Sequence, residues 1–349
     1  MFSNLIGNKT AKETLKRMLT AGRVPGALLF VGAEGVGKKL FAFEIAKAIL
    51  CRQPKNLEAC DLCASCIRVG KFVFPKTDEE IKVAKKKVLW STHPDVGLLY
   101  PMGKEILVDA MRDVEREANF RPYEGTRRFF IIDRADKMRD GASNALLKTL
   151  EEPPATSHLF LITSRMSALL STIRSRCQVV RFAPVSSDKI EKHLLREGKV
   201  TQADAQLFAR ASQGSIGRAL SLDIQLYKQQ REAMMKVLEA LTVTNDSARL
   251  LRSSEELNDV KIKDEYETRL DVLETLIHDV WTLSLNTEEK IVNEDLKDEL
   301  KNFSEYTKSK YAADWIKQIE TVREQLAVNI NRKVATDALF MKMAGLKVN

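Results

Sequence analysis

A glycine-rich segment that ends in two lysines is the clearest candidate for chemistry in this sequence. Residues 32–39 read Gly-Ala-Glu-Gly-Val-Gly-Lys-Lys, which fits the pattern G-x-x-x-x-G-K. Loops of this kind surround phosphate groups with backbone N–H groups at the N-terminus of a helix. An apolar run at Ala27–Val31 precedes the segment and a helical pattern at 38–50 follows it. The predicted nucleotide-contacting residues of the loop are Gly32, Gly35, Gly37 and Lys38.

The residue after the loop lysine departs from this pattern. The position normally holds Ser or Thr, whose hydroxyl group is a ligand of the Mg²⁺ that bridges the phosphates. Here it is Lys39, and an ammonium group has no lone pair to offer a metal ion. We therefore expect the site to handle Mg-ATP poorly. Two interpretations of the loop stay open: a relic that only shapes the fold, or a site that binds nucleotide without hydrolysing it.

Four of the five cysteines lie close together in the sequence. Cys51, Cys60, Cys63 and Cys66 have the spacing C-x8-C-x2-C-x2-C. Two successive C-x2-C pairs can place thiolates on one tetrahedral Zn²⁺, and Cys51 would complete the four ligands. Four protein ligands leave no open position for water, so the predicted zinc site is structural. Free or redox-active cysteines are the alternative. Cys177 stands alone and is predicted to pack in the core.

The elements that must position these groups follow an α/β pattern. Short apolar runs alternate with helical periods over residues 1–183, which is typical of a parallel sheet covered by helices. Helices are predicted at 38–50 and 141–152, and the second ends before Pro153 as helices usually do. Asp133 ends a predicted strand, where the metal-side carboxylate of a nucleotide site is expected. The predicted strands are Ala27–Val31, Phe129–Asp133, His158–Thr163 and Gln178–Phe182, with a weaker one at Val96–Tyr100.

The rest of the chain is predicted to be helical. Pro184 and the polar residues after it indicate a linker, and residues 186–222 indicate a small helical unit. From about residue 224 onward the apolar residues recur at i, i+3, i+4 and i+7, as in amphipathic helices. One such series is Leu270, Leu273, Leu276, Ile277, Val280 and Trp281. Another is Trp315, Ile316, Ile319, Val322, Leu326 and Ile330.

Composition and charge narrow the class of protein without fixing it. The 349 residues are 44% hydrophobic and 30% charged, which describes a globular chain long enough for two or three domains. The start shows no secretory signal and no apolar run is long enough to span a membrane, so we expect a cytoplasmic protein. A net charge of +8 is compatible with a DNA partner and equally with none. The lysines at 85–87 lie in a segment, 71–90, that interrupts the α/β pattern, and a solvated insertion is favoured over a DNA contact.

Several stretches together resemble one family. They are the cysteine cluster, His93–Val96 (HPDV), Asn144–Pro154 (NALLKTLEEPP), Thr172–Cys177 (TIRSRC) and Asn329–Asn331 (NIN). With these residues the chain resembles the clamp-loader branch of the AAA+ superfamily and, within it, the delta-prime subunits of bacterial DNA polymerase III. The resemblance covers nearly the whole chain. It implies an AAA+ α/β module with a five-stranded parallel sheet at 1–183 and a zinc module at 51–66. A helical lid at 184–222 and a helical collar domain at 223–349 would follow.

The resemblance also assigns a role to Arg176. In this family the arginine of the Ser-Arg-Cys motif reaches across a subunit boundary to the γ-phosphate of ATP bound by the neighbour. A planar guanidinium with five donors and a fixed charge suits that task. The alternative is an ion pair of Arg176 within the chain, and Arg174 is close enough in the sequence to be confused with it.

Departures from the family pattern concern the nucleotide site. An active AAA+ ATPase carries Glu after the strand carboxylate to activate water, whereas this chain has Arg134, which cannot accept a proton near neutral pH. Thr163 and Ser164 both match the first sensor position, so its identity stays open. Arg218 lies one residue beyond the usual place of the sensor arginine in the lid, a turn of ~100° on a helix.

The resemblance therefore implies a subunit that does not hydrolyse ATP by itself. It would work within the DNA polymerase III holoenzyme, a DNA-directed DNA polymerase. There it would offer Arg176 to ATP held by gamma/tau-type ATPase subunits and act with the delta subunit, the sliding clamp and primed DNA. Zn²⁺ would be its own structural cofactor. An active clamp-loader ATPase of the gamma/tau type is one alternative. A zinc-dependent DNA-binding protein on an inactive AAA+ scaffold is another.

Overall fold

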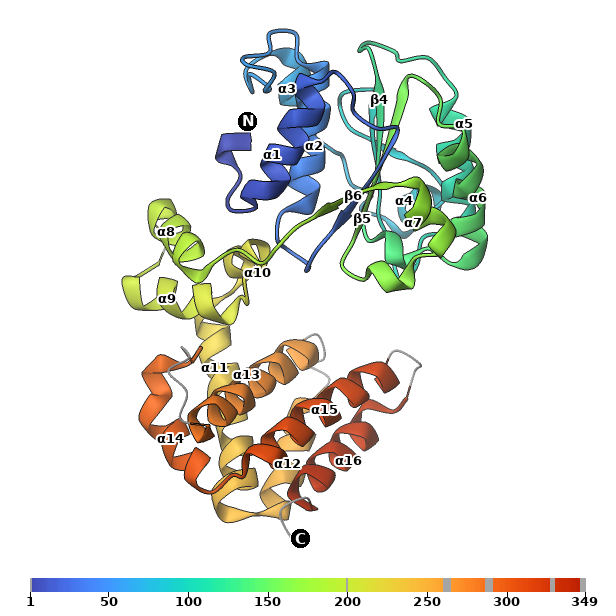
Figure 1. Cartoon of the computed structure of the whole chain (residues 1–349). Coiled ribbons are helices and arrows are strands. Elements are labelled where there is room, and N and C mark those ends of the chain that lie inside the picture. The colour runs from blue at the N-terminus through green and yellow to red at the C-terminus, as the bar shows by residue number, and fades with distance from the viewer. Residues whose placement is uncertain (1, 199, 260–264, 286–290, 327–329, 346–349) are drawn as a thin grey trace. The chain divides into compact units, whose positions relative to one another are not determined.

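The computed structural model describes residues 2–198, 200–259, 265–285, 291–326 and 330–345. Its chain forms two compact units (Figure 1). The first contains Met1–His193 and Gln213–Leu220, and the second contains Leu194–Ser212 and Ser221–Asn349. The three-part division at 183 and 222 stays a prediction.

The first unit is built on a sheet of six strands in the order β2-β3-β4-β5-β1-β6. Five strands are parallel, as expected, but β2 pairs antiparallel with β3 at the edge of the sheet. The prediction of five strands was therefore one short. The strands are β1 (Ala27–Val31), β2 (Leu89–Trp90), β3 (Val96–Leu99), β4 (Arg128–Ile132), β5 (Ser157–Thr163) and β6 (Gln178–Arg181).

Both faces of this sheet are covered by helices, so β1 and β3 are apolar along their length. The edge strand β6 differs, since it begins and ends with the exposed polar residues Gln178 and Arg181. Leu28 and Phe30 of β1 pack on one face with residues of α1 (Lys9–Thr20) and α2 (Lys38–Leu50). Leu29 points to the opposite face and packs with residues of α5, α6 and α7. Figure 1 shows these two helical layers on either side of the strands. The helices of the second layer are α5 (Val108–Ala118), α6 (Asp140–Glu151) and α7 (Ser171–Arg176).

Several predicted strand and helix ends shift by one residue. β4 ends at Ile132 instead of Asp133 because Arg134 adopts a left-handed backbone conformation (φ 52°) that turns the chain away from the sheet. The backbone N–H of Asp133 still donates to the Leu99 carbonyl (2.8 Å), so the carboxylate stays at the C-terminal edge. β3 ends at Leu99 and β6 ends at Arg181, each one residue earlier than predicted, and β5 begins one residue earlier, at Ser157. α6 begins and ends one residue earlier than the predicted helix at 141–152.

The segment 71–90 contributes more to the fold than a solvated insertion. It contains α4 (Asp78–Ala84) and the edge strand β2. The Phe72 ring lies 5.7 Å from that of Phe43 on α2, and the Phe74 ring lies 5.8 Å from that of Tyr100. The insertion therefore extends the sheet and covers apolar side chains. The small helices α3 (Ala64–Arg68), α8 (Ser187–Glu197) and α10 (Ile216–Ser221) complete the helices that belong wholly or partly to the first unit.

The second unit consists of helices in the part of it that the structure describes. Leu270, Leu273 and Leu276 are buried on α13, and Trp315 and Ile319 are buried on α15, as the apolar spacing predicts. Ile330 is not part of α15, which ends at Leu326, and Asn329 of the predicted Asn-rich signature lies outside the described residues. None of the described helices has the length and apolar character that crossing a membrane requires. The helices are α9 (Gln202–Ala211), α11 (Ile224–Glu239), α12 (Ser247–Leu257), α13 (Tyr266–Ser284), α14 (Lys297–Glu305), α15 (Ser309–Leu326) and α16 (Arg332–Gly345), with a π-helical turn at Ala240–Thr244.

Candidate functional site

The glycine-rich loop connects β1 to α2 and opens onto a cavity of about 820 Å³ within the first unit. Gly35 and Gly37 have positive φ angles of 76° and 97°, a conformation that glycine adopts without steric cost. Gly32 does not line the cavity. A side chain there would collide with the Phe182 carbonyl, 2.5 Å from the Cβ position, so this glycine allows close packing against the residue that follows β6. The predicted site residues that line the cavity are Gly35, Gly37, Lys38, Lys39, Asp133 and Thr163.

Lys38 is bonded to its own loop. Only 6% of the residue is exposed, and its Nζ donates to the carbonyls of Gly32 and Ala33, both at 2.6 Å. Burial lowers the pKa of Lys38, and the nearby carboxylate of Asp133 opposes that shift. The ammonium group that would reach a phosphate is thus held by backbone oxygens.

Lys39 and Asp133 form an ion pair at the position where a metal ion would be held. Lys39 Nζ lies 2.9 Å from Asp133 Oδ2, and the other carboxylate oxygen, Oδ1, accepts the backbone N–H of Arg134 at 3.1 Å. Both oxygens that could bind Mg²⁺ therefore already have donors within the chain. The guanidinium of Arg134 forms an ion pair with Glu34 of the loop. Arg134 stands where a water-activating carboxylate is expected, so this position too holds a residue that is paired within the chain.

The two sensor candidates differ in their surroundings. Thr163 is buried at the end of β5; its hydroxyl donates to Asp136 Oδ1 (2.7 Å) and accepts the backbone N–H of Arg165 (3.0 Å). Ser164 is exposed. Both residues line the cavity. Thr163 therefore shares a hydrogen-bonded cluster with a carboxylate of the site.

Residues 213–220 pack directly against the loop. Gly217 N–H donates to the Gly35 carbonyl at 2.9 Å, and a side chain at Gly35 would collide with the Ser215 hydroxyl. Ile216, Gly217 and Leu220 line the cavity, whereas Arg218 is not among its lining residues in the described part of the chain. Arg218, which lies one residue beyond the usual place of the sensor arginine, therefore does not line the cavity.

Arg176 lies apart from the cavity, at the end of α7. Its NH2 group is 2.7 Å from Glu151 Oε1, and its NH1 group donates to the Thr172 carbonyl at 2.9 Å. The intrachain ion pair that was the alternative interpretation is therefore present. Arg174 differs, since its Nε is buried without a hydrogen-bond partner among the described residues.

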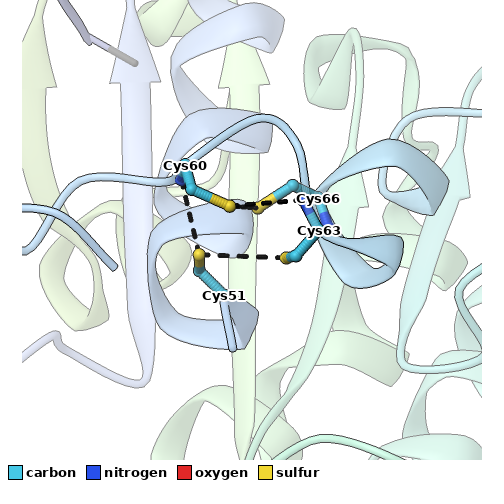
Figure 2. Close-up of side chains that lie close together, drawn as sticks. All are labelled: Cys51, Cys60, Cys63 and Cys66. Atoms are coloured by element: carbon cyan, nitrogen blue, oxygen red, sulfur yellow. Dashed lines mark hydrogen bonds between the residues drawn. The ribbon is translucent and has the colours of Figure 1, made fainter. Parts of the chain in front are cut away.

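The four clustered cysteines come together in space (Figure 2). Their sulfur atoms all lie within 4.8 Å of one another. The Sγ atoms of Cys51 and Cys63 are 3.9 Å apart, and those of Cys60 and Cys66 are 4.0 Å apart. A tetrahedral Zn²⁺ with Zn–S bonds of about 2.3 Å requires sulfurs about 3.8 Å apart. The geometry of the four residues therefore fits a zinc ion.

Backbone N–H groups support negative charge on these sulfurs. Cys60 N–H donates to Cys51 Sγ, Cys63 N–H to Cys60 Sγ, and Cys66 N–H to Cys63 Sγ, at 3.3–3.5 Å. Although burial acts to raise the pKa of the Cys63 thiol, hydrogen bonds from backbone N–H groups and from the Cys66 and Cys60 side chains lower it to about 6. Burial raises the pKa of Cys51 and of Cys66. Metal ions bind the thiolate form. Cys177 is the contrasting case: it is buried in the core, and burial raises its pKa to about 12.

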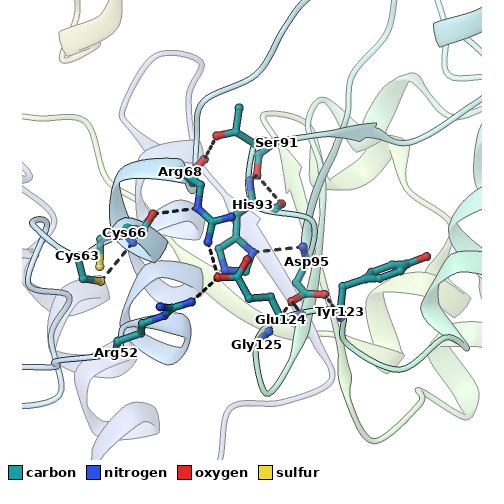
Figure 3. A network of polar contacts seen from close by, with 12 residues as sticks. Arg52, Cys63, Cys66, Arg68, Ser91, His93, Asp95, Tyr123, Glu124 and Gly125 are labelled. Carbon is teal, nitrogen blue, oxygen red and sulfur yellow. Dashed lines mark hydrogen bonds and ion pairs between the residues drawn. The ribbon is translucent and has the colours of Figure 1, made fainter.

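A polar network that sequence reasoning did not find joins the cysteine cluster to the sheet (Figure 3). The buried carboxylate of Asp95 accepts three backbone N–H groups, from Tyr123, Glu124 and Gly125, at 2.7–2.9 Å. Glu124 in turn forms ion pairs with Arg52, next to Cys51, and with Arg68 on α3. The HPDV stretch was the only sequence signal for this network. Its partners are 28–30 residues away in sequence, so spacing could not identify them.

The fold and the cavity define an α/β protein with a glycine-rich loop of the phosphate-binding pattern, beside which Lys39 and Asp133 form an ion pair. A model of the family described as DNA polymerase III, delta subunit, matches residues 7–186, and one of its C-terminal part matches residues 225–340. The delta-prime subunit of Bacillus subtilis is 27% identical over 91% of this chain and 91% of that protein. The delta-prime subunit of Escherichia coli is 34% identical over 68% of this chain and 66% of that protein. The tau subunit of Bacillus subtilis is 29% identical over 78% of this chain and 46% of its own length.

The chain belongs to the DNA polymerase III delta-prime family and is related to the tau and gamma subunits. The predicted fold class is confirmed as an α/β module on a mostly parallel sheet followed by helical parts, apart from the additional edge strand.

Proposed function

We propose that the chain is a clamp-loader subunit that does not hydrolyse ATP and instead supplies Arg176 to ATP held by a neighbouring gamma/tau-type subunit. In this role it acts with the delta subunit while the assembly places the sliding clamp on primed DNA. The membership in the delta-prime family and the relation to tau and gamma support this assignment.

The ion pair between Lys39 and Asp133 is the observation that carries the proposal. Hydrolysis of ATP in a phosphate-loop protein needs a Mg²⁺ held by the loop hydroxyl and the strand carboxylate. Lys39 replaces the hydroxyl and its ammonium lies 2.9 Å from the carboxylate, where it repels a second cation. Arg134, paired with Glu34, replaces the residue that would activate water. The site therefore lacks both the metal shell and the general base.

Arg176 has the properties that an arginine finger needs. It lies at the C-terminal end of a helix outside the cavity, and its side chain is 34% exposed. A guanidinium group stays charged at every physiological pH and can bind phosphate oxygens in a bidentate manner. In the transition state of phosphoryl transfer, negative charge on these oxygens is stabilised by such a group.

Zinc would have a structural role in this subunit. Cys51, Cys60, Cys63 and Cys66 would hold the ion and leave it no open coordination position, so it would fix the fold of the module and take part in no reaction step. The ion pairs of Glu124 with Arg52 and Arg68 connect this module to the sheet that carries the loop.

Reconstitution with the gamma/tau-type and delta partners tests the proposal. In the Arg176→Ala assembly, ATP turnover at the site that Arg176 contacts should fall by a factor on the order of 10³. The total DNA-stimulated turnover of the assembly should therefore fall by the fraction that this one site contributes. Assembly, measured by gel filtration, should persist. Arg174→Ala in the same motif is the matched control and should retain turnover. Full turnover in the intact Arg176→Ala assembly would remove the assignment.

A further inference from the structure

Arg176 is held in a defined position by the ends of two helices. It is the last residue of α7, and Glu151 is the last residue of α6. Arg176 NH2 is 2.7 Å from Glu151 Oε1, and NH1 donates to the Thr172 carbonyl at 2.9 Å. Both terminal nitrogens of the guanidinium are thus bound within the subunit. Two of the five N–H donors, one on each terminal nitrogen, are therefore taken within the subunit, and a phosphate in another subunit must compete for the same guanidinium.

The position of Glu151 is unfavourable for α6 itself. The C-terminal end of a helix carries partial negative charge, so a carboxylate there is repelled unless a cation lies beside it. Glu151 closes α6, and Glu152 follows it directly. Arg176 offsets the repulsion at Glu151. A carboxylate at this unfavourable position is explained if its role is to hold the guanidinium of Arg176.

The ion pair is also weak enough to be exchanged. The two side chains are 34% and 50% exposed, and exposed ion pairs contribute little net stability because water and salt screen them. A terminal phosphate group offers more negative charge and several oxygens in a geometry that matches the guanidinium fork. The phosphate should therefore take the guanidinium from the carboxylate once it is within reach.

We propose that Glu151 is a positioning residue that holds Arg176 in a withdrawn position until the terminal phosphate of ATP in the neighbouring subunit takes over the guanidinium. This inference rests on the proposed function of Arg176. The withdrawn form lowers the fraction of subunits ready to contact phosphate. It thereby raises the ATP concentration needed for half-maximal turnover, because apparent affinity scales with the competent fraction.

Steady-state ATP hydrolysis by the reconstituted assembly tests this inference with Glu151→Gln, which removes the charge and keeps the shape. The half-saturating ATP concentration should fall about two- to fivefold. The turnover rate at saturating ATP should change less than this concentration does. The difference from wild type should shrink as salt is added, because the pair is screened. Glu151→Asp, which retains a carboxylate, should restore part of the wild-type value.

Glu152→Gln is the matched control, since Glu152 is exposed at the next position and has no ion pair to Arg176. It should leave the half-saturating ATP concentration unchanged. On an Arg176→Ala background, Glu151→Gln should have no further effect, as expected for two residues that act through one contact.

The outcomes separate the two proposals. A loss of turnover in Glu151→Gln, an unchanged half-saturating concentration, or an equal effect in Glu152→Gln would overturn the role of Glu151 and leave that of Arg176 intact. If Arg176→Ala alone leaves turnover unchanged, the proposed function fails, whatever Glu151→Gln does.

Discussion

The cavity at the glycine-rich loop and the cysteine cluster differ in what their side chains contact. In the cavity, the two cationic residues that depart from the expected motif form ion pairs within the chain: Lys39 with Asp133, and Arg134 with Glu34. In the cluster, four sulfur atoms lie close to one another, at the spacing that a shared metal ion requires. Hydrogen bonds from backbone N–H groups favour the thiolate form of Cys63.

This difference leads us to expect a bound ion at the cysteines and none between Lys39 and Asp133. Charges that neutralise each other lower the gain from binding an ion, because an existing pair must be broken first. Four sulfur atoms that converge on one point gain directly from a metal ion that they share. A sequence motif therefore predicts where a ligand site lies. The contacts of its side chains within the chain then indicate how much free energy the binding of an ion would add.

The largest expected effect is the loss of the cysteine site. Replacing Cys63 and Cys66 together by Ser should reduce the zinc content from about one ion per chain to none. It should also destabilise the first unit by more than about 4 kcal/mol, since loss of a structural metal is among the most damaging changes. Metal analysis and urea unfolding measure the two effects.

Cys177→Ala is the control for that experiment. This cysteine is buried in the core, and the structure places it in a different cluster of apolar residues from the other four. The variant should keep its zinc and lose about 1 kcal/mol. A double Ser variant that stays as stable as wild type, or a wild-type protein purified without zinc, would contradict the contrast between the two sites.

A gain of magnesium-dependent binding should follow from Lys39→Thr. The substitution supplies the missing hydroxyl ligand and frees Asp133 from its ion pair, so both metal-side groups become available. Binding of ATP in the presence of Mg²⁺, measured by calorimetry, should tighten at least about tenfold, which corresponds to ~1.4 kcal/mol.

Hydrolysis should not return in this variant, because Arg134 still occupies the position of the general base. Lys39→Ala, which frees Asp133 without supplying a hydroxyl, is the matched control and should gain less. If wild type already binds Mg-ATP as tightly as Lys39→Thr, the ion pair does not have the effect assigned to it.

The smallest expected effect is a pH dependence of stability that arises from His158 in the sheet of the first unit. His158 on β5 stacks on Phe129 and its Nδ1–H donates to the Pro25 carbonyl (3.0 Å). Burial lowers the pKa of His158 below its ordinary value of 6.5, and this hydrogen bond opposes the shift. Below about pH 6.5 the unfolded chain therefore binds a proton that the folded chain does not. Stability should fall with decreasing pH, by at most ~1.4 kcal/mol per pH unit for this residue.

Urea unfolding between pH 7 and pH 5.5 measures this slope, and His158→Gln should reduce it. His93, whose pKa burial also lowers, should account for part of what remains. A slope that is identical in wild type and His158→Gln would show that His158 titrates alike in the folded and unfolded states.

The sequence was most informative where a pattern is local. The apolar run Ala27–Val31, the glycine spacing after it and the helix at 38–50 define one continuous unit, and the structure contains it with those bounds. The cysteine spacing was similarly sufficient, because its members lie within one short segment. In both cases the residues that act together are neighbours in sequence.

What could not be predicted depends on contacts between distant segments. The strand Leu89–Trp90 has two residues, too few for a periodic signal, and forms because β3 offers it an edge. The partner of Asp133 is 94 residues away, and the three backbone donors to Asp95 are 28–30 residues away. Glu151 and Arg176 were each visible in the sequence, but only the fold brings the ends of their helices together.

ATP hydrolysis by the purified chain without partner subunits tests the central claim most directly. Because Lys39 and Arg134 occupy the positions of the metal ligand and the general base, the account predicts no turnover above the background of the buffer, with or without primed DNA. Sustained Mg²⁺-dependent turnover that persists in Lys39→Ala would contradict it.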